Sequence, residues 1–358
     1  MKESVIERNE RLRTDLRVRD FIARQHQDYN FKRLYARTRV REYVAWCREH
    51  GYEMHVSVGG LDSITLLCFI RDLGYDIPAV SVSTLEDKSI QKIHEQLGVI
   101  KLKPIKPKVQ IIKEYGYPVL SKEIAAKIDL LQKQTPESAT VRHAIITGET
   151  GAYGGFRKGT RMQLSKRWLE LFGGADPEGA AKGYQAAPFS VSSKCCYYLK
   201  EKPCDDYARE HHSVPFLGLM ASEGGRRAKA LMMHGCNYYG DTTIRSCPFA
   251  IFYRQDLLQL AVDLKVPVPE IYGEIVRDMD GTLRTTGAQR TGCSMCGFGI
   301  HMEKRPHRFD KLYQENPKEW KFWMIDMGWG KVLDYIGVGW TPETLEEQMQ
   351  FDFSEKAV

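Results

Sequence analysis

Long hydrophobic runs are missing from this 358-residue chain. No apolar stretch approaches the roughly 20 residues that a membrane-spanning helix needs, so we expect no membrane segment. The first residues lead into charged sequence without the apolar core of a secretory signal, and we expect a cytoplasmic protein. Internal repeats and low-complexity segments are also missing. Hydrophobic residues make up 42% and charged residues 27%, which argues against disorder, collagen-like and coiled-coil architectures and favours a globular chain with a sizeable core.

An excess of one charge is small and confined to the start of the chain. The net charge is +6, and residues 1–50 hold 13 Lys and Arg against 8 Asp and Glu, so the rest is nearly neutral. This basic arm permits contact with nucleic acid, a phosphorylated substrate or an acidic partner. The alternative, which we favour, is a solvated helix face stabilised by ion pairs between neighbouring turns.

Strand and helix patterns alternate from residue 53 onward. Residues 53–58, 79–83 and 99–102 resemble strands, and residues 64–73 and 88–97 resemble helices that end at glycines. This alternation with short connections predicts an α/β fold: an open parallel sheet with helices on both faces. Additional helices are expected over residues 5–26, 39–50 and 119–133, a strand over 144–147, and a loop over 148–160.

We expect three regions along the chain. A basic helical N-terminal arm covers residues 1–38, the α/β domain covers residues 39–300, and a helical extension covers residues 301–358. The extension is expected to be helical and packed because its sequence is aromatic and charged, with four tryptophans between residues 320 and 340.

A glycine-rich turn follows the first predicted strand. Gly59 and Gly60 would let the backbone approach an anion closely, and the N-terminus of the following helix would favour the anion's negative charge. Asp62 and Ser63 are expected to cap that helix, and the Ser63 hydroxyl to meet a phosphate oxygen. Neither standard phosphate motif, G-x-x-x-x-G-K-S/T or G-x-G-x-x-G, is present. Residues 155–160 (G-F-R-K-G-T) resemble the first motif without matching it. The alternative is an ordinary turn with a capping side chain.

Two cysteine pairs form the second conspicuous pattern. Cys195 and Cys196 are adjacent, Cys293 and Cys296 form a C-x-x-C, and 96 residues separate the pairs. Four thiolates can hold a [4Fe–4S] cluster or a zinc ion, and adjacent cysteines suit the corners of a larger cluster better. Redox-active or core cysteines remain the alternative. Of the other five cysteines, Cys204 is a possible extra thiol near the site. Three are expected core residues: Cys47, Cys68 and Cys236. Cys247 could have either role.

These segments resemble a known family. Residues 58–63 (V-G-G-L-D-S) are similar to the S-G-G-x-D-S pyrophosphate loop of the adenine-nucleotide α-hydrolase (PP-loop) superfamily, with Val58 in place of the first serine and Ser57 just before it. Residues 194–203 resemble the C-C-x-x-x-K-x-x-P segment of the phosphoadenosine-phosphosulfate (PAPS) reductase family, and residues 291–296 its G-C-x-x-C segment. Shorter similarities fall at residues 115–118, 222–227, 245–248, 256–257 and 271–272, and residues 296–336 resemble an uncharacterised phage-associated subgroup.

The resemblance implies a Rossmann-like (HUP-type) fold and a set of site residues. It implies a [4Fe–4S] cluster on Cys195, Cys196, Cys293 and Cys296. It implies an adenine nucleotide, either ATP or adenylyl sulfate or PAPS, bound by Ser57, Gly59, Gly60, Asp62, Ser63, Lys194 and Lys200. The expected catalytic residues are Asp62, Ser63, Arg226 and Arg245. Asp62 would orient Mg²⁺ or the loop. The guanidinium groups of Arg226 and Arg245 suit phosphate or sulfate.

Three functions are compatible with these features. Reductases of this family use a thiolate near the C-terminus, but no cysteine follows Cys296 here. The preferred hypothesis is therefore ATP-dependent adenylation of a substrate oxygen coupled to sulfur transfer, with a sulfur- or electron-donor protein as partner. The first alternative is a sulfonucleotide reductase that uses Cys204 or Cys247 instead. The second is a non-catalytic module for nucleotide binding or redox sensing, which Val58 and Leu61 favour. A nucleic-acid substrate and a homo-oligomer are both permitted.

Overall fold

The computed structural model describes residues 16–342 except residues 290 and 294, and it describes residues 226 and 227 only by their backbone. The chain divides into two compact units, each built from separate stretches of sequence. Residues 16–105 and 199–293 form what we call the sheet unit, and residues 106–198 and 295–342 form the helical unit. Each unit has its own core of buried hydrophobic side chains.

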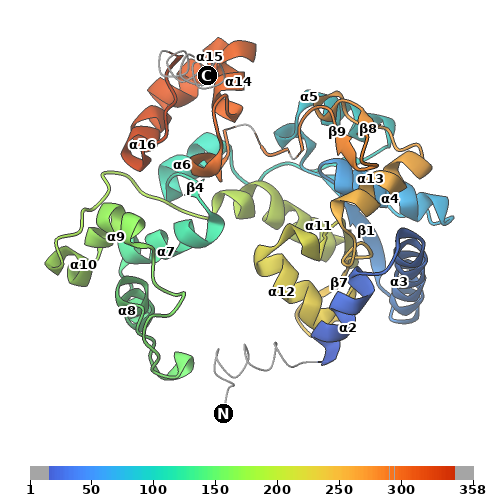
Figure 1. The fold of residues 1–358 in the computed structure, drawn as a ribbon, viewed down its shortest axis with the longest axis horizontal. Helices are drawn as coiled ribbons and strands as arrows, with labels where there is room; N and C mark the ends of the chain where they lie inside the picture. The colour runs from blue at the N-terminus through green and yellow to red at the C-terminus, as the bar shows by residue number, and fades with distance from the viewer. Residues whose placement is uncertain (1–15, 290, 294, 343–358) are drawn as a thin grey trace. The chain divides into compact units, whose positions relative to one another are not determined.

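The sheet unit contains a six-stranded, mostly parallel sheet (Figure 1). Its strand order is β3-β2-β1-β5-β7-β6, and only the edge strand β6 runs antiparallel to its neighbour. The strands are β1 (Glu53–Ser57), β2 (Ala79–Ser81), β3 (Ile100–Lys101), β5 (Ser213–Leu217), β6 (Asn237–Tyr239) and β7 (Ile244–Ser246). The parallel sheet flanked by helices confirms the predicted α/β class.

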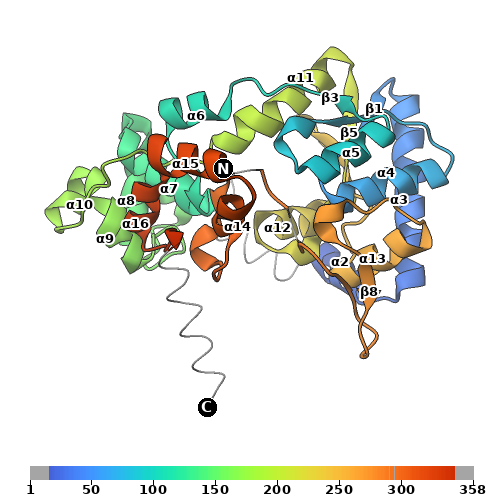
Figure 2. The ribbon, with the colours of Figure 1, turned by 90° about the horizontal axis from the view of Figure 1, so that it is seen from above.

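Helices of the sheet unit connect and cover these strands. They are α2 (Leu16–Gln25), α3 (Tyr29–Glu49), α4 (Leu61–Asp72), α5 (Lys88–Gln96), α11 (Lys202–Glu210), α12 (Gly225–His234) and α13 (Arg254–Asp263). A separate hairpin of β8 (Ile275–Arg277) and β9 (Leu283–Thr285) projects from this unit (Figure 2). Two short 3₁₀ turns, η1 (Ser83–Leu85) and η7 (Glu270–Tyr272), lie near the candidate site described below.

The helical unit consists of short helices around a two-stranded parallel sheet. Its strands are β4 (Val119–Leu120) and β10 (Gly297–Phe298). Its helices are α6 (Lys108–Tyr115), α7 (Lys122–Lys133), α8 (Ala139–Thr147), α9 (Lys166–Phe172), α10 (Pro177–Ala181), α14 (Arg308–Glu315), α15 (Pro317–Lys321) and α16 (Trp329–Ile336). The π-helical segment Phe322–Asp326 also belongs to this unit, and a second one, Tyr197–Glu201, spans the boundary between the two units in the sequence.

Several local predictions need correction. Residues 144–147, predicted as a strand, belong to α8, because a short buried apolar run does not by itself distinguish a strand from a helix. Residues 119–120 form β4, and the predicted helix begins only at Lys122. The helix predicted from residue 64 begins at Leu61. The predicted helix over residues 39–50 is the second half of α3, so the expected boundary at residue 38 lies inside a helix.

Helix α3 uses its charged residues inside the fold. The buried Lys32 ammonium group lies 2.7 Å from a carboxylate oxygen of Asp256 and 4.3 Å from the centre of the Tyr253 ring. The Tyr29 hydroxyl donates to Asp263 at 2.5 Å, and Arg39 pairs with Glu42. Only the Arg39–Glu42 pair joins neighbouring turns as the favoured alternative expected, whereas Lys32 is buried and pairs with a distant helix; contact of the arm with a partner stays a prediction. Within the residues that the structure covers, no helix is both long and apolar enough to cross a membrane.

Candidate functional site

The glycine-rich turn lies at the carboxyl end of the central strand. Strand β1 pairs with β2 on one side and β5 on the other, so Ser57 lies opposite Val80 and Leu217. The chain then turns through residues 58–60 into α4. In parallel sheets this edge, where successive strands are added on opposite sides, is where ligands bind. The predicted strand–turn–helix is therefore confirmed, together with its place in the sheet.

Gly60 is required by a close approach of Tyr272. A Cβ atom at position 60 would lie 2.3 Å from the Tyr272 hydroxyl oxygen and 3.2 Å from the Thr291 hydroxyl oxygen. That Tyr272 oxygen accepts a hydrogen bond from Leu61 N–H at 3.2 Å and lies 2.8 Å from Thr291 Oγ1. Burial raises the pKa of Tyr272, so the phenol stays protonated. Tyr272 therefore holds the first turn of α4, so residues 271–272, whose similarity to the family is noted above, contact the glycine-rich turn.

Ser63 closes the loop instead of capping the helix. Its hydroxyl oxygen accepts a hydrogen bond from Gly59 N–H at 2.7 Å and donates to Gly60 O at 2.9 Å. The N-cap residue of α4 is Gly60, which has no side chain, so the prediction that Asp62 or Ser63 caps this helix is wrong. The Ser63 hydroxyl oxygen is therefore the hydrogen-bond acceptor of the Gly59 N–H group.

His94 fixes the peptide group between the two glycines. Its Nε2 atom lies 2.8 Å from Gly59 O, and its Nδ1 atom lies 2.9 Å from the Ser83 hydroxyl. A carbonyl oxygen only accepts, so Nε2 carries the proton. Burial lowers the pKa of this fully buried imidazole, which is therefore neutral and accepts from Ser83 at Nδ1. Because the peptide is planar and trans, holding Gly59 O on one side directs Gly60 N–H to the other.

Two ion pairs border the loop. Asp62 pairs with Arg254, whose guanidinium group also donates to Gln289 O at 3.3 Å. The buried Glu86 carboxylate pairs with Lys200, and a Cβ atom at Gly59 would lie 3.7 Å from Glu86 Oε1. The structure thus places the predicted Lys200 beside the predicted loop. It also adds Arg254 and Glu86, which carry no motif that could have identified them in the sequence.

Gly218 lets the neighbouring strand end close to the same helix turn. A Cβ atom at this position would lie 2.9 Å from Ser63 Cα and 3.0 Å from Ser63 N. These are backbone atoms, which cannot move aside as a flexible side chain can. The glycine directly after β5 is therefore a second steric requirement of the site, and a glycine at the end of a predicted strand is the signal that would have suggested it.

The remaining predicted nucleotide residues belong to other elements of the chain. Arg245 is on β7, with its guanidinium carbon 5.9 Å from the centre of the Tyr238 ring. Arg226 lies in the first turn of α12, and its side chain is outside the described residues. Lys194 belongs to the helical unit, where its ammonium nitrogen is 5.1 Å from the centre of the Tyr115 ring. The roles predicted for these three residues stay predictions.

The predicted cluster ligands occupy both units. Cys195 is buried and Cys196 half-buried at the start of a helical segment, and Cys296, whose carbonyl accepts from Arg308 at 3.0 Å, directly precedes β10. These three belong to the helical unit, and Cys293 belongs to the sheet unit. Over residues 16–342, without 290 and 294, no three His, Cys, Asp or Glu side chains are arranged to hold a metal ion. The cluster stays a prediction from the sequence.

The other cysteines are mostly buried. Cys47, Cys236 and Cys247 are inaccessible to solvent, which confirms the core role predicted for the first two, whereas Cys68 is only half-buried. Burial raises the pKa of Cys204 to about 11. Burial disfavours the thiolate form of Cys204 and Cys247, and the role of either thiol as a nucleophile stays a prediction.

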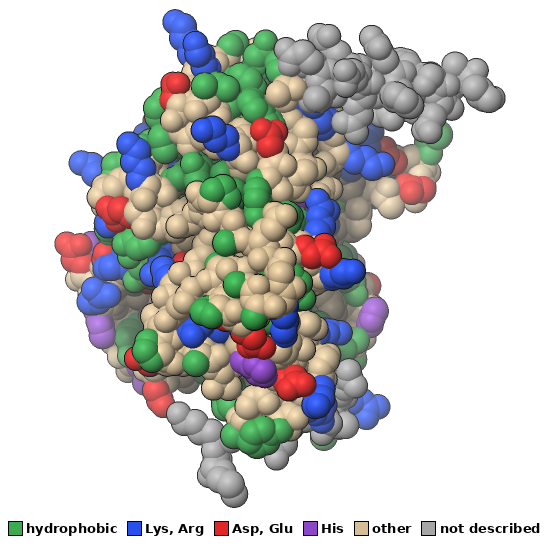
Figure 3. Space-filling model, turned by 90° about the vertical axis from the view of Figure 1, so that its left-hand side faces the viewer, with side chains coloured by type: hydrophobic (Ala, Val, Ile, Leu, Met, Phe, Trp, Pro, Cys, Tyr) green, Lys and Arg blue, Asp and Glu red, His purple; other side chains and the backbone are tan. Residues whose placement is uncertain are grey.

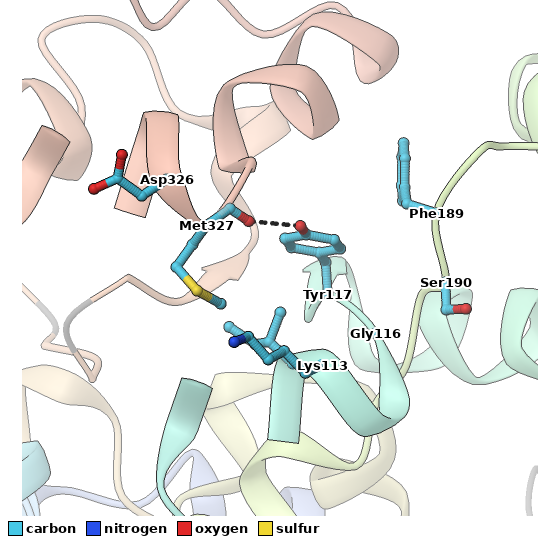
Figure 4. A pocket seen from close by; sticks show the side chains of 8 residues that line it. Lys113, Gly116, Tyr117, Phe189, Ser190, Asp326 and Met327 are labelled. Carbon is cyan, nitrogen blue, oxygen red and sulfur yellow. Dashed lines mark hydrogen bonds between the residues drawn. The ribbon is translucent and has the colours of Figure 1, made fainter. Parts of the chain in front are cut away.

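A cavity of about 340 Å³ lies in the helical unit, and none of the residues that line it is a predicted site residue (Figure 4). Lys113, Tyr117, Phe189 and Met327 line it, and the Tyr117 hydroxyl donates to Met327 O at 2.6 Å. Tyr117 belongs to the stretch 115–118 that resembles the PAPS reductase family, and none of the four was predicted as a site residue.

Comparison of the chain with protein-family models, with curated proteins and with solved structures found no match. The family resemblance therefore rests on the sequence motifs alone.

Proposed function

We propose that this protein binds an adenine nucleotide at residues 57–63 and that ATP is its substrate for adenylating an oxygen atom, in a reaction coupled to sulfur transfer. The observation that carries the proposal is the shape of the loop. Two glycines, one of them required by the 2.3 Å approach of Tyr272, connect the central parallel strand to the N-terminus of α4. A helix N-terminus at this sheet edge favours an anion through its N–H groups and its dipole.

The contacts around the loop suit a diphosphate. When a phosphate oxygen accepts the hydrogen bond from Gly59 N–H, Ser63 is released from it and can donate its own hydroxyl proton to the phosphate. His94 and Tyr272 keep the loop in one conformation, so little conformational entropy is lost on binding. Lys200 and Arg254 supply positive charge beside the loop, each balanced by a carboxylate until an anion binds.

In the proposed reaction, a substrate oxygen attacks the α-phosphorus of ATP. The bond between this phosphorus and the bridging oxygen to the β-phosphate breaks, and pyrophosphate leaves with the negative charge. The loop would hold this leaving group, because its N–H donors stabilise charge that develops on the pyrophosphate oxygens. Asp62 lies at the same helix turn, where the resemblance expects it to orient Mg²⁺ or the loop.

The cluster belongs to the proposal through the sequence resemblance. Four cysteine sulfurs are the usual donor set of a [4Fe–4S] cluster, and bound there it would supply electron transfer or sulfur chemistry. The alternative of a sulfonucleotide reductase is less well supported, because Cys247 is buried and burial raises the pKa of Cys204. Its nucleophile would have to be a thiolate at neutral pH.

Product analysis tests the proposal. Protein purified without oxygen is assayed for iron and sulfide, then incubated with ATP, Mg²⁺ and candidate acceptors. We expect about four irons per chain, and AMP with pyrophosphate as products. ADP with phosphate would contradict cleavage at the α-phosphorus. Bound ATP without turnover of any acceptor would favour the non-catalytic module, and sulfite released from adenylyl sulfate or PAPS would favour the reductase.

A further inference from the structure

The loop of residues 148–161, which joins α8 to the turn before α9, exposes two large aromatic side chains that the nucleotide site does not use. Tyr153 is 61% exposed and Phe156 is 76% exposed. Phenylalanine is among the residues most often buried, so a ring this exposed, three residues from a second exposed ring, indicates a contact surface. We call residues 148–161 the aromatic loop.

Hydrogen bonds within the aromatic loop hold it in one shape. The Thr150 hydroxyl donates to Gly154 O at 2.9 Å, and Thr150 N–H donates to Arg157 O at 2.9 Å. Thr160 N–H closes the base of the loop by donating to Gly148 O at 3.1 Å. The two rings are therefore displayed on an ordered scaffold, and a partner that binds them does not need to order the loop first.

The backbone at Phe156 adds a second sign that its ring is displayed. Phe156 has φ of 51°, in the left-handed region that non-glycine residues rarely adopt. The neighbouring Gly155 and Gly159 adopt similar angles without cost. A glycine at position 156 would relieve this strain, yet the chain has the more exposed of the loop's two rings there.

Basic residues follow the two rings in the sequence. The sequence from Gly148 to Trp168 contains five basic residues and one acidic residue. The Lys158 side chain is 82% exposed and lies 3.5 Å from its one acidic neighbour in this stretch, Glu149. Arg161 is also exposed. Figure 3 faces the side of the protein that carries α9 and α10, and hydrophobic side chains are exposed at its lower end beside charged side chains of both signs.

We propose that the aromatic loop binds single-stranded nucleic acid. Unpaired bases stack on Tyr153 and Phe156, and phosphates pair with Lys158 and Arg161. Exposed aromatic rings between cations are the elements with which proteins bind single strands, since every unpaired base offers a flat face. A duplex has its base faces already stacked, and we expect it to bind more weakly. This proposal does not depend on nucleotide binding at residues 57–63.

Fluorescence anisotropy of a labelled 20-nucleotide poly(dT) strand tests the proposal on the full chain. We expect binding that weakens as salt rises, because lysine and arginine displace counterions from phosphates. The Phe156→Gly variant should bind at least about fivefold more weakly, since stacking on one ring is worth that factor or more. Its thermal stability should be unchanged or higher, because glycine adopts this φ without strain. Replacing Lys158 and Arg161 by glutamine should reduce the salt slope by about 1.4.

Phe322→Ala provides the matched control, because this ring is 40% exposed in the same unit but lies outside the aromatic loop. It should leave poly(dT) affinity unchanged. Absence of binding by the unaltered chain at low salt would overturn the proposal, as would equal losses in Phe156→Gly and Phe322→Ala. Tighter binding of a duplex of the same length would also overturn it. So would loop-dependent binding to phosphatidylserine vesicles without any binding of poly(dT), which would identify the partner as a lipid surface.

Discussion

Replacement of Gly60 by alanine is the sharpest test of the loop geometry. The added methyl carbon would lie 2.3 Å from the Tyr272 hydroxyl oxygen, whereas real Cβ contacts are essentially never below 3.0 Å. Tyr272 must therefore withdraw by about 0.7 Å, which lengthens its hydrogen bond from Leu61 N–H, now 3.2 Å, beyond bonding range. Overpacking costs about 1–3 kcal/mol and the lost hydrogen bond about 1 kcal/mol, so we expect about 2–4 kcal/mol of destabilisation.

Two further variants separate this explanation from a general effect of altering the loop. Gly59→Ala adds the same methyl group one residue earlier, where the nearest atoms lie 3.7 and 3.9 Å away, so it should change stability by less than about 0.5 kcal/mol. Tyr272→Phe removes the clashing oxygen and leaves the ring carbon Cζ at 3.6 Å from the new methyl group. The double variant Gly60→Ala/Tyr272→Phe should therefore be about 1–2 kcal/mol more stable than Gly60→Ala alone.

Guanidinium unfolding of the four proteins measures these differences through the transition midpoint. The reasoning would be refuted if Gly60→Ala and Gly59→Ala unfolded at the same midpoint. It would also be refuted if Tyr272→Phe made Gly60→Ala less stable, because the clash would then not involve the tyrosine oxygen.

Three other predictions concern stability. Burial lowers the pKa of His55 to about 4, so below pH 6.5 the unfolded chain binds a proton that the folded chain does not bind. About 3 kcal/mol of stability, fully present above pH 6.5, should therefore be lost as the pH falls to 4. Unfolding of a His55→Leu variant should lack this dependence on pH. Burial alone would raise the pKa of Asp310, yet hydrogen bonds from His307 and Arg305 lower it to about 2. Asp310→Asn leaves the Arg305 charge buried without its partner and should cost about 3 kcal/mol of stability. An unchanged melting temperature would contradict this. Gly218→Ala, with its methyl carbon 2.9 Å from backbone atoms of α4, should cost about 1–3 kcal/mol in urea unfolding, and a neutral effect would show that the strand end can move.

The sequence predicted the part of the site that depends on local pattern. Alternating apolar residues followed by Gly59 and Gly60 predict a strand, a tight turn and a helix, because each choice depends on neighbours in the chain. The structure confirms these elements and their place at the edge of a parallel sheet. The error at residues 144–147 has the same origin, since three apolar residues followed by a threonine suit a buried strand as well as one side of α8.

The partners of the loop could not be predicted, because they come from distant positions. His94 lies 35 residues after the carbonyl it holds, and Arg254 lies 192 residues after Asp62. A buried histidine on α5 and an arginine at the start of α13 are ordinary residues of their helices when viewed alone. Only the folded chain shows which of the many polar residues meet at the loop. The same reason applies to Gly218, whose neighbours are backbone atoms of another element.

The most direct test of the central claim is calorimetric titration of ATP with Mg²⁺ into the unaltered protein, Ser63→Ala and Thr65→Val. Thr65→Val is the matched control, because the Thr65 hydroxyl lies on the same helix but donates to Leu61 O, not to Gly59 or Gly60. If residues 57–63 bind the nucleotide, ATP should bind the unaltered protein and Thr65→Val alike, and bind Ser63→Ala about tenfold more weakly, since a hydrogen bond to a charged group contributes about 1.5 kcal/mol or more. No heat of binding with ATP, or equal affinity in all three proteins, would contradict the account.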